Sequence, residues 1–180
     1  MTDPGPPLLF LDVDGPLIPF GATWEERPGG YPTYRTGVEP GDSNPLLVRI
    51  NPAHGPRLAG LPCRLVWATT WMDEANSCVA PRLGLPELPV VIWPEPTCTD
   101  GRAEWHGLHW KTRTLLDWAA GRPFVWVDDE ITERDRDWVS ARYRGQALLH
   151  RVDPRRGLVD ADFAAIEAWL RTIRPAPEGS

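Results

Sequence analysis

Lysine is almost absent from this sequence of 180 residues. Lys111 is the single lysine among 19 basic side chains, and all the others are arginine. A general preference for arginine accounts for the scarcity, but a planar, forked guanidinium does not replace a compact ammonium everywhere. We therefore ask whether position 111 requires an ammonium group.

Cysteine is also scarce, and long apolar runs are lacking. The three cysteines are Cys63, Cys78 and Cys98, and they form no CxxC pair. This indicates reduced thiols and argues against a disulfide framework. His106 and His109 have no carboxylate or third histidine at metal-ligand spacing, which argues against a zinc role. No apolar run reaches the length of a membrane span, and the first residues do not resemble a secretory signal. We therefore expect a cytoplasmic protein with no membrane partner.

Net positive charge is lacking too. The formal charge of −6 argues against a general nucleic-acid coat protein, which would be basic. The charge is uneven, however, because the stretch from Arg134 to Arg156 holds seven arginines against three aspartates. This stretch is either a solvated surface or a face that contacts anions beside an active site.

Short apolar runs alternate with amphipathic segments along the chain. The length and the 42% hydrophobic content predict one domain over residues 1–174 and a flexible tail at 175–180. The alternation predicts a parallel α/β sheet with helices on both faces. The predicted strands are Leu8–Val13, Arg64–Ala68, Val90–Trp93, Phe124–Val127 and Ala147–His150, with Leu46–Ile50 as a further candidate. The predicted helices cover residues 52–61, 71–83, 108–120, 131–143 and 163–173, the last capped by Asp160.

Acidic and hydroxyl side chains stand where three of the predicted strands end. These residues are Asp12 and Asp14, Thr69 and Thr70, and Asp128 and Asp129. In sheets of this kind ligands bind at the carboxyl ends of the strands. Carboxylates there are costly to desolvate unless they have a partner, and Mg²⁺ takes a few carboxylates together with water and phosphate oxygens. The pattern therefore predicts that the four aspartates surround one Mg²⁺.

An Asp-x-Asp pair at the mouth of a strand suits phosphoryl transfer. One carboxylate can attack phosphorus to give an aspartyl-phosphate, and the second can protonate the leaving oxygen and later activate water. A hydroxyl and a lysine are then needed to hold the anionic phosphoryl group. Thr69 or Thr70, and Lys111, are the candidates for these two roles. Each motif is common alone, but their order in one compact α/β chain favours a single site.

These motifs resemble those of the haloacid dehalogenase (HAD) superfamily. LLFLDVDG resembles its first motif, LVWATTW the second, Lys111 the third and VWVDDE the fourth. The resemblance implies a three-layer Rossmann-like fold with a flap after the first strand and little or no cap domain. It implies a Mg²⁺-dependent phosphatase with Asp12 as nucleophile and metal ligand, and Asp14 as acid/base with its backbone carbonyl on the metal. It also implies Thr69 as the phosphate-binding hydroxyl, with Thr70 the weaker candidate, and Asp128 as a metal ligand supported by Asp129.

Other stretches resemble HAD domains associated with RNA-repair proteins. These are NPAHG, the EAN that follows WATTW, RPFVWVDDE and GLVDADFAAIEAWL. One departure from the superfamily is Pro16, which follows DVDG where Thr or Val is usual. Because proline removes a donor and stiffens the turn, we expect an altered flap with the chemistry retained.

An open site would admit a bulky phosphorylated substrate, such as a nucleotide or a polynucleotide end. Trp24, Tyr31, Tyr34 and Trp71 either stack on a base at the mouth of the site or pack within the flap and core. The alternatives are a small-metabolite phosphatase and a non-catalytic module that binds phosphoesters or RNA. Dehalogenation needs no metal, so the Asp128-Asp129 pair argues against it. The oligomeric state is left open by the sequence.

Overall fold

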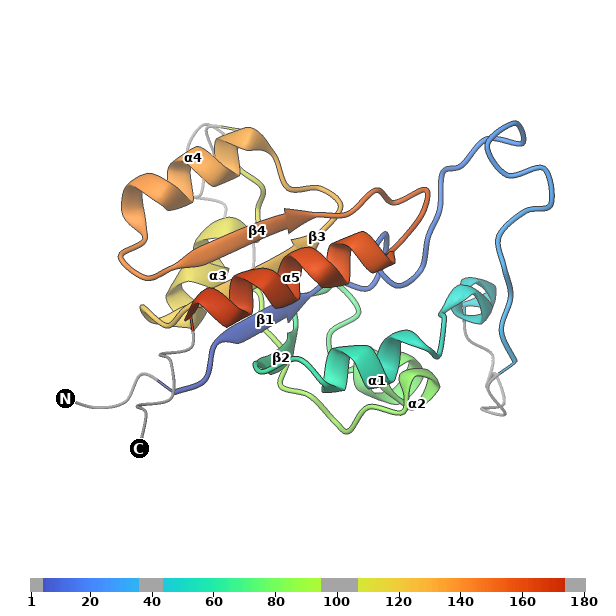
Figure 1. Cartoon of the computed structure of the whole chain (residues 1–180), viewed down its shortest axis with the longest axis horizontal. Coiled ribbons are helices and arrows are strands. Elements are labelled where there is room, and N and C mark those ends of the chain that lie inside the picture. Colours follow the sequence, from blue (N-terminus) through green and yellow to red (C-terminus); the bar gives the residue numbers. More distant parts are fainter. Residues whose placement is uncertain (1–4, 36–43, 95–106, 174–180) are drawn as a thin grey trace.

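Four parallel strands form the centre of the molecule (Figure 1). The computed structural model describes residues 5–35, 44–94 and 107–173. The strands are β1 (Leu8–Leu11), β2 (Arg64–Trp67), β3 (Phe124–Asp128) and β4 (Ala147–Arg151), and they lie in the order β2-β1-β3-β4. All three pairings are parallel. The predicted parallel α/β fold is confirmed.

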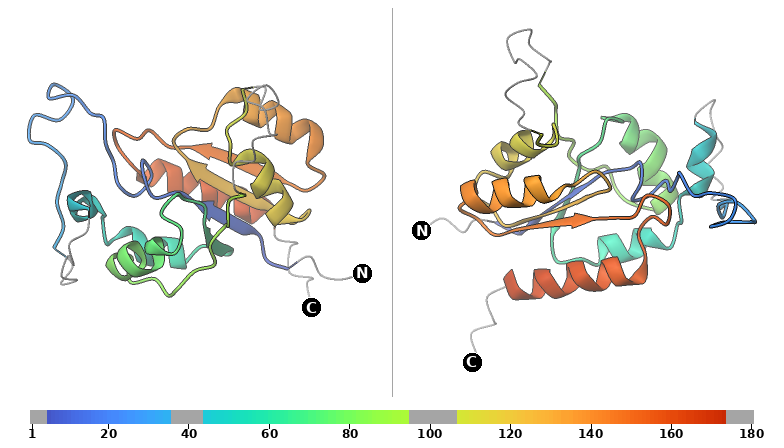
Figure 2. Two further views of the ribbon diagram at one scale, coloured as in Figure 1. Left: turned by 180° about the vertical axis from the view of Figure 1, so that it is seen from behind. Right: turned by 90° about the horizontal axis from the view of Figure 1, so that it is seen from above.

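Helices cover both faces of the sheet. Successive residues of an apolar strand point to opposite sides, so both faces are apolar and both are buried. Leu9 and Leu11 belong to the core cluster packed by α1 (His54–Ala59), α2 (Ala80–Leu83) and α5 (Asp160–Ile173). Leu8 and Phe10 belong to the opposite cluster, packed by α3 (Thr112–Ala119) and α4 (Glu133–Arg142). Figure 2 shows α1 and α5 on one side of the sheet and α3 and α4 on the other. The buried strands are therefore apolar on both faces, as their continuous apolar runs indicate.

One predicted strand and one candidate strand do not form. Leu46–Ile50 was the candidate, but residues Pro45–Arg49 are a 3-10 helix, η1. The Asn44 side chain accepts a hydrogen bond from the backbone N–H of Leu46, and proline favours the first helical position, so the local signals select a helix. The run Val90–Trp93 makes only one isolated parallel bridge, between Val90 and Trp67. The flanking prolines, Pro89 and Pro94, cannot donate to a longer ladder.

The helix predicted over 71–83 begins later than expected. A π-helix, η2, spans Ala75–Val79 and leads into α2. Residues 69–73 instead form an irregular turn, in which Met72 takes a left-handed conformation with φ of 50°. Because of this late start, Trp71 lies before the helix, and the turn sets the direction of its side chain.

The segment after β1 supplies the expected flap. Residues 15–35 contain no helix or regular strand, and in Figure 1 this blue segment projects beyond the carboxyl ends of the strands. Among the described residues between β1 and β2, η1 and α1 are the only regular elements, so no cap domain is seen in that part. The predicted tail at 175–180 lies outside the described residues, as do Cys98 and His106. No described helix has the length and apolar character needed to cross a membrane.

Candidate functional site

Two acidic residues meet at the carboxyl edge of the sheet because their strands are neighbours. Leu11 of β1 pairs with Val127 of β3, so Asp12 and Asp128 emerge side by side. Lys111, which immediately precedes α3, reaches both. Its Nζ donates hydrogen bonds to Asp12 Oδ2 at 2.7 Å and to Asp128 Oδ2 at 2.8 Å. The first, third and fourth motifs are thus brought together.

The three side chains are buried, so their charges interact strongly. Lys111 is 2% exposed, Asp12 8% and Asp128 0%. Although burial acts to lower it, the pKa of Lys111 is raised above its usual value by Asp12 and Asp128, so this ammonium stays charged. Burial raises the pKa of Asp12 to about 7, with Lys111 opposing the rise and Asp128 adding to it. One ammonium facing two carboxylates leaves the site with an excess of negative charge.

Backbone and indole donors fix the other carboxylate oxygens. Asp12 Oδ1 accepts the backbone N–H of Val13 at 2.8 Å. Asp128 Oδ1 accepts the backbone N–H of Glu130 at 2.9 Å, and Asp128 Oδ2 accepts the Trp126 indole N–H at 3.2 Å. These hydrogen bonds fix the orientation of both carboxylates, so they preorganise the acidic site.

Asp129 joins the same cluster. One oxygen each from Asp12, Asp128 and Asp129 lie within 4.8 Å of one another, and carboxylate oxygens are the protein ligands that Mg²⁺ prefers. Burial and the charge of Asp128 raise the pKa of Asp129 to about 6. This donor set fits a hard divalent cation, which would offset the excess negative charge.

Gly15 makes the approach of Asp129 possible. It has φ of 85°, and a Cβ atom built there would lie 2.6 Å from Asp129 Cγ. Any residue with a side chain would therefore meet both backbone strain and a clash. The DVDG motif therefore needs glycine at this position so that Asp129 of the fourth motif can lie against the first motif.

Asp14 stands apart from the other acidic residues. It belongs to neither candidate metal group of the described residues, and its Oδ2 accepts the Trp71 indole N–H at 3.0 Å. Thr69 is fully buried and its Oγ1 accepts the backbone N–H of Trp71 at 3.3 Å, whereas Thr70 is exposed. The Trp93 indole donates to the backbone oxygen of Thr69 at 2.9 Å. The two carboxylates of the Asp-x-Asp pair therefore have different surroundings.

A buried carboxylate missed by the sequence analysis anchors the segment that carries Lys111. Asp135 accepts hydrogen bonds from the His109 backbone N–H at 2.8 Å and from Thr112 Oγ1 at 2.7 Å. It also accepts the Thr132 N–H and hydroxyl at 2.9 and 2.6 Å in a capping box of α4. The TERD spacing predicts that capping box, but not the bonds to the start of α3. Asp135 thus ties the Lys111 segment to the loop that follows Asp128.

His109 has a role that its spacing did not predict. Its Nδ1 accepts the backbone N–H of Lys111 at 3.2 Å, which assigns the ring proton to Nε2. Nε2 then donates to Glu130 at 2.9 Å. His109, Asp128 and Glu130 form the second candidate metal group of the described residues. The sequence showed no carboxylate at metal-ligand spacing from His109, because the fold brings these carboxylates to it from another segment.

Arginine and aromatic side chains meet on the flap. Trp24 is 75% exposed, and the guanidinium carbons of Arg27 and Arg49 lie 4.9 and 4.3 Å from the ring centre of Tyr31. Arg155 binds Glu26 of the flap, with Nη1 2.6 Å from Oε1. The arginine-rich stretch at 134–156 therefore forms at least one ion pair with the flap and is not only a solvated surface.

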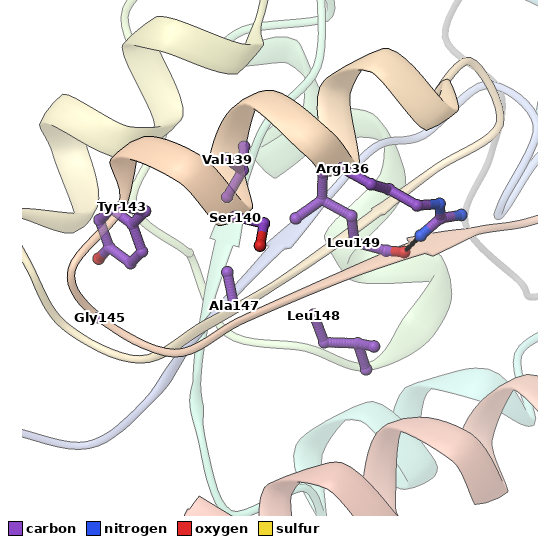
Figure 3. Close-up of a pocket in the computed structure, with 8 residues that line it drawn as sticks. All are labelled: Arg136, Val139, Ser140, Tyr143, Gly145, Ala147, Leu148 and Leu149. Carbon is purple, nitrogen blue, oxygen red and sulfur yellow. Dashed lines mark hydrogen bonds between the residues drawn. The ribbon is translucent and has the colours of Figure 1, made fainter.

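A separate pocket of about 380 Å³ lies between α4 and β4, the outer strand of the sheet (Figure 3). The Arg136 guanidinium donates to the backbone oxygen of Leu149 there, so it covers part of an open strand edge. None of the predicted site residues lines this pocket. The residues predicted from the motifs gather in the acidic cluster and not in this pocket.

The comparisons with known proteins agree with the motifs and the fold. Residues 8–163 match the family described as HAD domain in Swiss Army Knife RNA repair proteins. No curated protein and no solved structure matches the chain. The matched region includes all four motifs and every strand, and extends to the first turn of α5. The chain therefore belongs to the HAD-domain family of the Swiss Army Knife RNA repair proteins.

Proposed function

We propose that this protein is a Mg²⁺-dependent phosphohydrolase in which Asp12 attacks a phosphomonoester. The observation that carries the proposal is the contact of Lys111 with both Asp12 and Asp128, with Asp129 beside them. A surface turn would give neither the burial nor the convergence of these groups from three segments. Buried titratable groups with perturbed pKa values mark candidate functional sites.

The reaction runs in two steps, with Asp12 as the nucleophile. A carboxylate oxygen of Asp12 forms a bond to phosphorus while the bond from phosphorus to the ester oxygen breaks, and Asp14 gives its proton to that leaving oxygen. Asp14 then takes a proton from water, whose oxygen attacks the phosphorus of the aspartyl-phosphate. This releases inorganic phosphate and restores the Asp12 carboxylate.

Lys111 and Thr69 suit the phosphoryl oxygens. The Lys111 ammonium already holds Asp12, so it can neutralise charge as phosphorus approaches. Thr69 accepts the Trp71 N–H through Oγ1, which leaves its hydroxyl proton as a donor to phosphate. Thr70 is the exposed alternative for the same contact.

Asp12, Asp128 and Asp129 would hold Mg²⁺, with the backbone carbonyl of Asp14 as a further ligand. The bound cation supplies charge neutralisation to the phosphoryl oxygens and lets the anionic ester approach an acidic site. The protein's part is to gather the ligands through β1, β3 and Gly15. The raised pKa values of Asp12 and Asp129 mean that these groups need a cation to be fully ionised near neutral pH.

The flap supports a nucleotide or a polynucleotide end as the substrate. An exposed indole can stack on a base of any sequence, and arginine side chains attract a phosphate backbone. Trp24 offers the indole, and Arg27 and Arg49, whose guanidinium groups lie over Tyr31, offer the charge. The description of the family as RNA repair proteins supports the same class, whereas a small phosphorylated metabolite would not need this surface.

Hydrolysis of 4-nitrophenyl phosphate by the purified protein tests the activity. We expect turnover with Mg²⁺, none after chelation, and a loss of at least about a thousandfold in Asp12→Asn. Beryllium fluoride with Mg²⁺ should inhibit the wild type by imitating the phosphorylated carboxylate. Turnover by Asp12→Asn at the wild-type rate would refute the nucleophile. Tight binding of a phosphorylated oligonucleotide without turnover under any divalent metal would favour a binding module instead.

A further inference from the structure

Three of the described indole N–H groups point at predicted site residues. Trp126 donates to Asp128, Trp93 to the backbone oxygen of Thr69, and Trp71 to Asp14. An indole nitrogen is a donor and never an acceptor of a hydrogen bond. Such a contact to a carboxyl group therefore orients the group and favours its proton on the other oxygen. This matters most for Asp14, the proposed acid and base.

Trp71 engages one oxygen of Asp14, and this is the only side-chain hydrogen bond to Asp14 within residues 5–35, 44–94 and 107–173. The indole nitrogen lies 3.0 Å from Asp14 Oδ2. Among the described residues, Asp14 lies outside the candidate metal groups, while Asp12, Asp128 and Asp129 gather in one. The carbonyl oxygen of a carboxylic acid accepts hydrogen bonds better than its hydroxyl oxygen does. The indole contact at Oδ2 therefore orients Asp14 so that Oδ1 is the oxygen that carries and transfers the proton.

Trp71 is itself held in place. Its backbone N–H donates to Thr69 Oγ1 at 3.3 Å, and its backbone oxygen accepts the Glu74 N–H at 3.0 Å. Its ring packs against the core cluster that contains Val79 and Leu83. The following residue, Met72, has a left-handed backbone with φ of 50°, a conformation that costs free energy and persists only where its surroundings impose it. The turn therefore presents the indole in one orientation.

We infer that Trp71 is a positioning residue that binds Asp14 Oδ2 and so reserves Oδ1 for proton transfer to and from the substrate oxygen. The inference rests on the proposed function. It adds a role to Trp71 that differs from stacking on a base, because stacking uses the face of the ring and this contact uses its edge. It also gives the late start of η2 a functional consequence, since a regular helix from residue 71 would not leave the side chain in this turn.

The test compares substrates that differ in their need for an acid. Nitrophenolate leaves without protonation, whereas the alkoxide of a simple alkyl phosphate does not. In Trp71→Phe with Mg²⁺, first-turnover release of the alkyl alcohol should slow by about tenfold or more, with release of nitrophenol changed less than about threefold. KM should stay within about twofold for both substrates. Trp118→Phe is the matched control, because Trp118 packs edge-to-face on Phe10 in the opposite core, and it should alter neither rate.

A double-mutant cycle with Asp14→Asn separates positioning from packing. If Trp71 acts through Asp14, adding Trp71→Phe to Asp14→Asn should slow alkyl phosphate turnover by less than about twofold more. Equal losses on both substrates, or a full tenfold loss in the Asp14→Asn background, would overturn the inference. If the wild type is active and Trp71→Phe hydrolyses both substrates at the wild-type rates, only the inference about Trp71 is overturned. If the wild type is inactive, the proposed function and this inference are overturned together.

A second measurement needs no change at Trp71, in case Trp71→Phe does not fold. The indole N–H resonance of Trp71 should move in Asp14→Ala, because its acceptor is removed. The indole resonance of Trp126, whose acceptor is Asp128, is the internal control and should stay in place. A Trp71 resonance that does not move would contradict the contact on which the inference depends.

Discussion

Lys111 reaches from the start of α3 to Asp12 at the end of β1, and its Nζ lies 2.7 Å from Asp12 Oδ2. Both side chains are buried, and a second carboxylate, Asp128, lies 2.8 Å from the same nitrogen. The single lysine of the chain thus occupies a position where two carboxylates require a compact cation. A guanidinium is larger and planar, so it cannot take the same place without displacing its neighbours.

Replacement of Lys111 by arginine should therefore abolish most of the activity. We expect Lys111→Arg to lower kcat for 4-nitrophenyl phosphate by about a hundredfold or more, although the formal charge is unchanged. The control is Arg113→Lys, an exchange of the same two residue types at an exposed position two residues away, which should leave kcat within about twofold. Similar activity in Lys111→Arg and the wild type would show that any cation suffices.

Removal of the charge should affect stability in a way that depends on Mg²⁺. Lys111→Met leaves two buried carboxylates facing each other, and breaking a buried ion pair in this way costs about 3–5 kcal/mol. We expect the free energy of unfolding in urea to fall by that amount without metal. It should recover clearly with saturating Mg²⁺, because the metal replaces the missing positive charge. A loss of equal size with and without Mg²⁺ would mean that Asp12 and Asp128 do not bind the cation.

Gly15→Ala should weaken Mg²⁺ binding. The new methyl group would meet Asp129 at 2.6 Å and push that carboxylate out of the cluster. We expect a loss of about tenfold to a hundredfold in Mg²⁺ affinity by calorimetric titration, as is usual when the groups that orient ligands are changed. Gly121→Ala is the matched control, since Gly121 has φ of 84° and open space around its Cβ position. Both variants share the backbone strain, so a difference between them reports the contact with Asp129.

Mg²⁺ should stabilise the protein more at high pH than at low pH. The pKa of Asp12 is raised to about 7 and that of Asp129 to about 6, both from 3.8. Without metal, the folded chain keeps protons that the unfolded chain releases between about pH 4 and pH 7, so these two groups reduce stability as pH rises through that window. Mg²⁺ binds the ionised forms, so protons compete with it below about pH 7.

The measurement is the increase in Tm caused by Mg²⁺ across this pH range. We expect the increase to be largest above about pH 7 and to shrink steadily toward about pH 5. In Asp129→Asn, which removes one of the two titrating carboxyls, the increase should be smaller and should change less below about pH 6. A Mg²⁺ effect that is the same at every pH would contradict binding through these carboxylates.

Trp24→Ala should discriminate between large and small substrates. If the exposed indole stacks on a base, the loss should be about 1–3 kcal/mol per base, seen as a KM about tenfold higher for a phosphorylated oligonucleotide. Hydrolysis of 4-nitrophenyl phosphate by the same variant is the control and should be unchanged. An unchanged KM for the oligonucleotide would indicate that the flap serves another substrate, such as a small phosphorylated metabolite.

The sequence could predict the elements whose signals are local. Continuous apolar runs identify β1, β2 and β3, because strands buried on both faces need apolar residues at nearly every position. The edge strand β4 is only partly buried, and its short apolar run Ala147–Leu149 is enough to identify it. The run at 46–50 was misjudged because its capping asparagine and proline outweigh its apolar character, and the run at 90–93 because prolines bound it. The order of the motifs also indicated that Asp12, Lys111 and Asp128 would share a site.

Other features depend on residues far apart in the chain, and only the fold brings them together. The sequence determined the parallel α/β class, the acidic strand ends and the unusual single lysine, because each is a property of composition or local spacing. The tertiary structure decided that Gly15 makes room for Asp129, that Asp135 anchors the Lys111 segment, and that Trp71 binds Asp14. These contacts join residues from 26 to 114 positions apart, and their geometry follows from strand order and helix packing, which no local pattern encodes.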